Sequence, residues 1–275
     1  MKQLYTIAAA AAVLAGVARA ETGVVPTVDE VVAKTNRAAY YQGTDGRARV
    51  SMTITDSQGR ERTREFTILR RDEPGPEGTA PDEFAGDQKF YVYFQRPADV
   101  NKMVFMVWKH AAADRDDDRW LYLPALDLVK RIAGAEKRTS FVGSDFFYED
   151  VSGRGIGEDV HELAEITDNY YVLKNTPKDP SSVEFDHYLM WIHKDTFLPV
   201  KIEYYDTAGE PIREYAALGV ETIAGFPTVT RSMMKNLKTG SRTEMSYSNV
   251  AYNIGLPDEI FSERYLRKPP REYLR

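Results

Sequence analysis

The stretch RARVSMTITDSQGRERTREFTILRR, residues 47–71, decides the fold class of this 275-residue chain. Its first part places apolar residues at positions 48, 50, 52 and 54, with polar residues between them. A period of two is typical of a strand that buries one face. The turn sequence DSQG at 56–59 follows, and residues 60–71 return as a second strand. The stretch therefore predicts an antiparallel sheet.

The same alternation recurs towards the C-terminus, between turn signals such as KTG at 238–240. Ahead of the sheet, Thr27 and Glu30 form a capping box, which predicts a helix that reaches about Tyr41. Residues 257–266 predict a short closing helix, and the proline- and glycine-rich residues 72–88 predict a long loop. The alternation predicts further strands over residues 89–95, 102–109, 119–123, 128–133, 160–166, 169–175, 184–193, 200–205, 213–220, 228–237 and 241–250.

We therefore expect one mainly β domain over residues 21–275, built as an antiparallel meander with a helix at each end. Antiparallel sheets commonly expose one face and bury the other. A strongly bent sheet with helices packed in its concave side would cover the apolar face. Incomplete filling of that side would leave a cavity.

The first twenty residues have the pattern of a secretory signal. A short basic start precedes an apolar run from Ile7 to Val17, and Ala18 and Ala20 fit the small residues of a cleavage site. The run is too short to cross a bilayer core of about 30 Å as a helix. The alternative, a buried alanine-rich helix, would lack caps and an amphipathic face. We expect cleavage after Ala20 and a product that is soluble in the periplasm.

Composition and motifs disfavour several classes of function. The net charge of −6 argues against a general nucleic-acid binder, and the absence of cysteine excludes disulfides, thiol catalysis and an N-terminal lipid anchor. The four histidines lack metal-ligand spacing, and the acidic run at 114–118 lacks the glycine of a calcium loop. No nucleotide-binding glycine loop is present. We expect no enzyme activity, no cofactor and no metal.

The densest aromatic cluster lies in SFVGSDFFYEDV, residues 140–151, between glycines and acids. Phe146, Phe147 and Tyr148 are consecutive, so they cannot all face one side of a helix or strand. One ring must point away from the main core, either as a structural plug or towards a ligand. We expect Phe147 to be core and Phe146 or Tyr148 to contact ligand. The acids should stay in water or pair with Lys130, Arg131 or Arg138.

Two motifs carry a resemblance to a known family. RWLYLPALDLVKRI at 119–132, followed by SFVGSDFFYEDV at 140–151, resembles the outer membrane lipoprotein-sorting proteins, the LolA-like proteins often associated with RND-type transporters. RPADVNKMVFMVW at 96–108 and the region 191–215 support it. The resemblance implies an unclosed β-barrel of about eleven antiparallel strands, covered by helices. It also implies carriage of a lipid or lipoprotein acyl chain without covalent chemistry.

The implied partners are a lipid or lipoprotein cargo and an inner-membrane RND-type transporter, with only transient membrane contact. A non-carrying accessory subunit of such an exporter is the alternative, and an enzyme acting on envelope lipids is a third. A filled core with an exposed apolar patch would favour the accessory subunit. The residues expected to line the cavity are Phe105, Val107, Trp120, Tyr122, Phe141, Phe146, Phe147, Tyr148 and Trp191.

Overall fold

The computed structural model describes residues 25–75, 77, 86–112 and 114–275. The expected signal sequence and most of the expected loop at 72–88 lie outside these residues. The described part of the chain forms one antiparallel sheet of thirteen strands, rather than the eleven that the resemblance implies. Each of the thirteen coincides with a strand predicted from the alternation of apolar and polar residues.

The helices and strands have the following bounds. The helices are α1 (Val28–Tyr40), α2 (Tyr148–Ser152) and α3 (Glu263–Arg267). The strands are β1 (Asp45–Thr55), β2 (Glu61–Asp72), β3 (Gln88–Arg96), β4 (Val104–Lys109), β5 (Asp118–Leu123), β6 (Leu128–Ile132), β7 (Asp159–Ile166), β8 (Tyr170–Pro177), β9 (His187–His193), β10 (Pro199–Tyr205), β11 (Pro211–Ile223), β12 (Phe226–Asn236) and β13 (Ser241–Tyr252).

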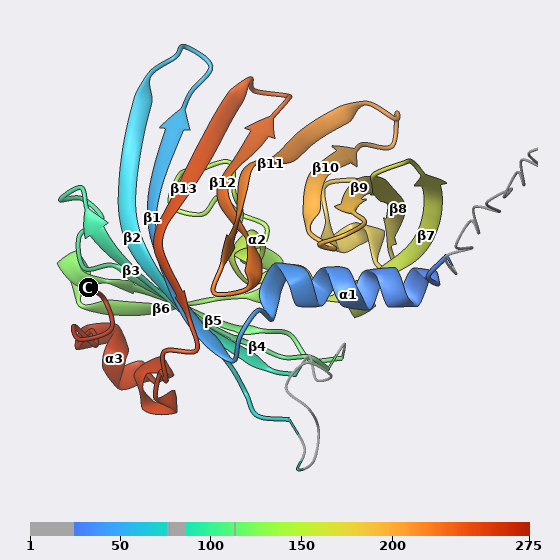
Figure 1. The fold of residues 1–275 in the computed structure, drawn as a ribbon. Coiled ribbons are helices and arrows are strands. Elements are labelled where there is room, and N and C mark those ends of the chain that lie inside the picture. Colours follow the sequence, from blue (N-terminus) through green and yellow to red (C-terminus); the bar gives the residue numbers. More distant parts are fainter. Residues whose placement is uncertain (1–24, 76, 78–85, 113) are drawn as a thin grey trace, which may run out of the picture.

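The sheet consists of two meanders that meet at its centre. The strand order is β6-β5-β4-β3-β2-β1-β13-β12-β11-β10-β9-β8-β7, so β1 and β13 are the neighbours that are far apart in sequence. They pair from Gly46 opposite Tyr252 to Thr55 opposite Arg242. β6 and β7 are the two edges and do not pair with each other, which leaves the barrel unclosed (Figure 1).

The connection from β6 to β7, residues 133–158, determines where the site forms. Since these strands lie at opposite edges of the sheet, the connection has to run from one edge to the other. It carries α2 into the space enclosed by the curved sheet (Figure 1). We call residues 133–158 the crossing segment. It contains the aromatic cluster that the sequence singles out.

Both faces of the strands β3 and β4 are buried, which explains the uninterrupted apolar run of β4. On the inner face Phe105 and Val107 belong to a core cluster that also contains Phe141 of the crossing segment. On the outer face Val104 and Met106 pack with the C-terminal residues, including Phe261. The C-terminal end therefore covers the convex side of the sheet.

The closing helix differs from the expectation for residues 257–266. It is divided into a 3₁₀ turn, Asp258–Phe261, and the short helix α3, because Ser262 between them has an extended backbone with φ −111° and ψ 162°. It also packs on the outer face of the sheet, whereas we expected helices in the concave side. The break lets Phe261 and Leu266 both face the sheet, where they are 1% and 0% exposed.

The N-terminal helix α1 begins as the sequence predicts. The Thr27 hydroxyl accepts from the Glu30 amide, and the Glu30 carboxylate accepts from the Thr27 amide. Val31 and Val32 then pack against Leu173 of β8 and other residues of the β7–β9 end. α1 thus covers that end of the sheet (Figure 1). Among the described residues, no helix is long and apolar enough to cross a membrane.

Candidate functional site

A cavity of about 390 Å³ lies between the sheet, α1 and the crossing segment. Both meanders contribute to its wall, with Phe66 from β2 and Met234 from β12 as examples. The crossing segment contributes Phe141, Phe146 and residues of α2 and its C-terminal end. The volume falls within the range of about 300–1,000 Å³ that is usual for small-molecule sites. The apolar wall suits it to an apolar ligand.

A tight turn directs the aromatic residues of the crossing segment. The Phe141 amide donates to the Phe146 carbonyl (2.8 Å), and the Ser144 amide donates to the Phe141 carbonyl (3.0 Å). The two central residues, Val142 and Gly143, have φ of +47° and +82°, as a type I′ hairpin turn requires. The segment therefore reverses on itself, and successive side chains then point to opposite sides.

The three consecutive rings separate as the geometry demands, but Phe147 is not the core ring that we expected. Phe146 and Tyr148 are 6% and 8% exposed and belong to the inner core cluster, and Phe146 also lines the cavity. Phe147 is half-buried and leaves that core. Its ring lies 5.1 Å from the guanidinium carbon of Arg138 and 4.0 Å from that of Arg213. The prediction that Phe147 is the core ring is therefore wrong.

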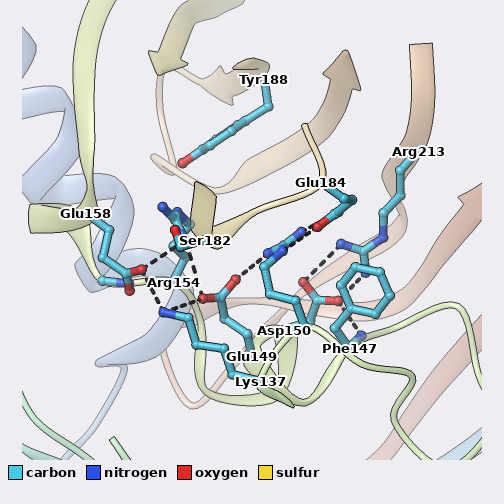
Figure 2. Close-up of polar contacts among 12 residues, drawn as sticks. Lys137, Phe147, Glu149, Asp150, Arg154, Glu158, Ser182, Glu184, Tyr188 and Arg213 are labelled. Atoms are coloured by element: carbon cyan, nitrogen blue, oxygen red, sulfur yellow. Dashed lines mark hydrogen bonds and ion pairs between the residues drawn. The ribbon is translucent and has the colours of Figure 1, made fainter. Parts of the chain in front are cut away.

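A buried ion network anchors the crossing segment beside the cavity (Figure 2). Glu149 is 1% exposed, and its carboxylate pairs with Lys137 (3.1 Å), Arg154 (3.4 Å) and Arg138. Arg138 also binds Glu184 of the connection before β9, at 2.6 Å. Of the three predicted partners, Arg138 is confirmed as a partner of Glu149, whose carboxylate is buried. Lys130 and Arg131 pair with Glu136 and Asp118 instead.

The network continues along both sides of α2. Arg154 binds Asp159 at the start of β7, at 3.0 Å, and the Tyr188 hydroxyl donates to the same carboxylate, at 2.8 Å. Asp150 accepts from the Phe147 amide (2.6 Å) and pairs with Arg213 of β11. The crossing segment is thus tied to the strands of the second meander (Figure 2), and Asp150, Arg154 and Asp159 also belong to the cavity lining.

The cations around Glu149 set its protonation state. Burial raises the pKa of Glu149, but Arg138, Lys137 and Arg154 outweigh it, so the pKa lies below its ordinary value. Glu149 therefore stays ionised at neutral pH. Since both of its oxygens are bound by cations, its arrangement suits positioning of the segment rather than proton transfer.

Of the nine residues expected to line the cavity, Phe141 and Phe146 do so. Phe105, Val107 and Tyr148 lie in the inner core cluster, in the core rather than on the cavity wall. Whether any of the nine contacts a ligand stays a prediction. The remaining residues lie elsewhere: Trp120 and Tyr122 in the outer-face cluster, Phe147 between two guanidinium groups, and Trp191 under Lys201, whose Nζ is 4.5 Å from its ring.

The outer position of three of these rings has a simple cause. Side chains of a strand alternate between its faces, and Trp191 lies between Met190 and Ile192, which face inwards. Likewise, Trp120 meets Trp108 edge to face, with ring centroids 5.1 Å apart, and the Trp108 Nε1 donates to the Phe261 carbonyl on the outer face. Within the described residues, no group of three His, Asp or Glu side chains forms a metal site.

Comparison with known proteins places this fold. A family model described as "Uncharacterized protein" matches residues 86–268, more than half of the chain. A protein domain from Vibrio parahaemolyticus, assigned to outer membrane lipoprotein sorting, is 26% identical, with a TM-score of 0.74 over 88% of this chain and 100% of that one. The chain belongs to the family of this model, and its structure is LolA-like.

Other solved structures resemble this LolA-like protein. A DUF1329 family protein from Desulfovibrio piger is 30% identical, with a TM-score of 0.77 over 88% of this chain and 100% of that chain. A LolA superfamily protein from Nitrosomonas europaea, 21% identical, shares the fold with a TM-score of 0.64 at the same coverage. No curated protein matches the sequence.

Sequence reasoning missed much of the cavity wall. Tyr40 on α1, Tyr204 on β10, Tyr215 on β11 and Tyr247 on β13 all line the LolA-like cavity. Tyr40 precedes the other three by 164 or more residues, so no local sequence pattern connects it with them. One signal was available for Tyr204, Tyr215 and Tyr247. In the apolar–polar alternation of their strands, each occupies a position whose side chain faces the inside of the sheet. We chose the predicted residues from aromatic-rich stretches of the sequence. Such stretches contain rings of the core and of the outer face as well as rings of the cavity.

Proposed function

We propose that this protein is a periplasmic carrier that shelters an acyl chain of a lipid or lipoprotein during transfer between membranes. The observation that supports the proposal is the apolar cavity enclosed by the sheet, α1 and the crossing segment. Each methylene kept from water contributes about 0.8 kcal/mol, so a sixteen-carbon chain needs shelter on the order of 10 kcal/mol. A preformed cavity offers that shelter without a reaction.

The sequence and the family support the proposed cellular setting. The signal pattern at residues 1–20 supports export, and intact-mass measurement of exported protein should show Glu21 as the first residue. An inner-membrane RND-type transporter as the partner is supported by the resemblance of the central motifs. A filled inner core would favour the accessory-subunit alternative. The inner core contains a cavity, which favours the carrier instead.

The proposal is tested by cargo analysis of the purified protein. Organic extraction followed by mass spectrometry should release a lipid in near-stoichiometric amount, and the stripped protein should bind a fluorescent lipid. Ile202→Trp, on β10 at the cavity wall, should reduce both by filling the space. Leu218→Trp is the matched control, because Leu218 is 40% exposed and lies outside the cavity lining.

The two variants also give the outcome that would reject the carrier function. If Ile202→Trp folds and binds lipid as the wild type does, the cavity is not the binding site. If the wild-type protein neither contains nor binds lipid, the accessory-subunit alternative gains support.

A further inference from the structure

Six tyrosines line the cavity, and two of them, Tyr188 and Tyr252, bond to Asp159 and Thr228. The other four phenol groups give the cavity a hydrogen-bonding region within its apolar wall. They belong to Tyr40, Tyr204, Tyr215 and Tyr247, from four different elements. Burial raises the pKa of all four, and the neighbouring phenols add to the rise at Tyr40 and Tyr215. The phenols therefore remain protonated hydrogen-bond donors at any physiological pH.

These phenols are poorly satisfied by the protein itself. Among the residues that the structure describes, the hydroxyls of Tyr40 and Tyr204 have no hydrogen-bond partner, and neither is sealed from the cavity space. The other two phenols have the single Ser232 hydroxyl as a neighbour, and the Tyr247 hydroxyl also reaches the Met245 sulfur, a weak acceptor, at 3.3 Å. Buried tyrosine hydroxyls usually find a partner, so a ligand or water has to supply one here.

Cationic groups at the cavity, in contrast, are already occupied. Arg70 donates to the carbonyls of Tyr40 and Gln42 and pairs with Asp72 at 2.9 Å. Arg138 and Arg154 belong to the ion network, where each pairs with at least two carboxylates.

The two remaining basic residues of the wall are oriented by protein oxygens. Arg47 directs its guanidinium towards the Tyr273 carbonyl in the outer-face cover, and its Nε has no partner among the described residues. Both ring nitrogens of His161 contact protein oxygens, at 2.7 and 2.8 Å. Among the described residues, the cations of the wall are thus bound by protein oxygens or, for Arg47, directed to the outer face, so an ionised carboxylate or phosphate inside the cavity would gain no free cation there. Asp150 adds a negative charge to the same wall.

We infer that the cavity takes an uncharged lipid whose polar part consists of ester or hydroxyl groups, an acylglycerol unit, in preference to a lipid with an ionised group at the buried end. The inference rests on the proposed carrier function and narrows its cargo. Ester carbonyls accept hydrogen bonds from the phenols, while the acyl chains contact the apolar wall. An acylglycerol unit occurs both in free acylglycerols and in the diacylglyceryl group of lipoproteins.

Monoolein and oleate give a matched test, because they share one acyl chain and differ in charge. Displacement of N-phenyl-1-naphthylamine from the full mature protein at pH 8 should show monoolein binding at least tenfold more tightly than oleate. Equal or tighter binding of oleate would overturn the inference. If neither displaces the probe, the carrier function itself fails, which is a separate result.

Substitution of the phenols tests their part directly. Tyr40→Phe and Tyr204→Phe each remove one donor and should weaken monoolein binding about fivefold, without a matching loss for oleate. Tyr170→Phe is the control, because Tyr170 lies on β8 outside the cavity lining. The double variant, Tyr40→Phe with Tyr204→Phe, completes the test. If it folds and still prefers monoolein to oleate as the wild type does, the phenols do not select the cargo.

A third arm distinguishes the two sources of the acylglycerol unit. A synthetic diacylglyceryl-cysteine peptide and dioleoylglycerol are compared in the same displacement experiment. Tighter binding of the peptide identifies lipoprotein as the cargo, and tighter binding of dioleoylglycerol identifies a free lipid.

Discussion

Gly153, at the C-terminal end of α2, shows how closely the crossing segment approaches α1. Its φ of +79° and ψ of 151° fall in a region that only glycine occupies readily. A Cβ atom there would lie 2.3 Å from the ring of Tyr40. Gly153→Ala should therefore lower the free energy of unfolding by about 2–4 kcal/mol, from backbone strain and overpacking together. Denaturant unfolding measures the loss.

Gly209→Ala separates the two causes. Gly209 has the same φ of +79°, but a Cβ atom there would meet no other atom within 4 Å, so the position carries only the backbone cost. The loss at Gly209 should be about 1 kcal/mol. Equal losses at the two positions would show that Tyr40 moves aside without cost.

Lys109 is a buried cation that titrates within an accessible pH range. Its Nζ donates to the Ser152 carbonyl at 2.8 Å and lies 4.8 Å from the Tyr40 ring. Burial lowers the pKa of Lys109 from 10.5 to about 8. Between these values the unfolded chain binds the proton and the folded protein does not, so the contribution of Lys109 to stability rises with pH.

Lys109→Met removes this dependence. The unfolding free energy of the wild type, relative to that of Lys109→Met, should rise by about 2 kcal/mol between pH 7.5 and pH 10. Urea unfolding at several pH values measures the difference. The exposed Lys238→Met is the control and should show no such trend. A falling difference would mean that Lys109 is stabilised as the cation.

At the scale of single elements, the crossing segment depends on Glu149. Glu149→Gln leaves Arg138, Lys137 and Arg154 without their shared carboxylate in a buried place. Removing one partner from such a network typically costs about 3–5 kcal/mol. Because the pKa of Glu149 is lowered, its contribution is present above the unfolded pKa and is lost as pH falls. The difference in unfolding free energy between the wild type and Glu149→Gln should therefore be smaller at pH 4 than at pH 7.

Glu136→Gln is the matched control within the same segment. Glu136 pairs at 2.8 Å with Lys130, and both side chains are well exposed. Its loss should change the unfolding free energy little, because exposed pairs contribute little. A similar deficit for both variants would indicate that the segment tolerates no change of charge, whatever the burial.

Individual elements were largely predictable because their signals are local. The capping box of Thr27 and Glu30 and the alternation within residues 47–71 each depend on neighbours a few positions apart. The orientation of Phe147 was not predictable in this way. It depends on a turn in which Val142, a β-branched residue, takes a positive φ, and on Arg213, which is 66 positions further along the chain.

At the scale of the whole molecule, the arrangement rests on contacts between distant parts of the sequence. The pairing of β1 with β13 joins residues near 50 with residues near 245, and Arg138 with Glu184 links the crossing segment to the second meander. Alternation cannot specify which strands pair, so the cavity was expected from the bent sheet and from family resemblance. Its phenol-bearing wall could be located only once the strands were placed.

The two faces of the sheet should act independently, with the cavity on one and the C-terminal cover on the other. Phe146 packs on the inner face and Phe261 on the outer face, in separate core clusters. Phe146→Leu and Phe261→Leu should each lower the unfolding free energy by about 1–2 kcal/mol. Since the two rings share no cluster, the double variant should equal their sum within about 0.5 kcal/mol.

Lipid binding should follow only one of the two changes. Phe146→Leu alters a residue of the cavity wall and should change the affinity for a fluorescent lipid, whereas Phe261→Leu should leave it unchanged at matched folded fraction. Coupling above about 1 kcal/mol in unfolding would show that the strands transmit packing changes between the faces. If Phe261→Leu changed the lipid affinity, the C-terminal cover would also contribute to lipid binding.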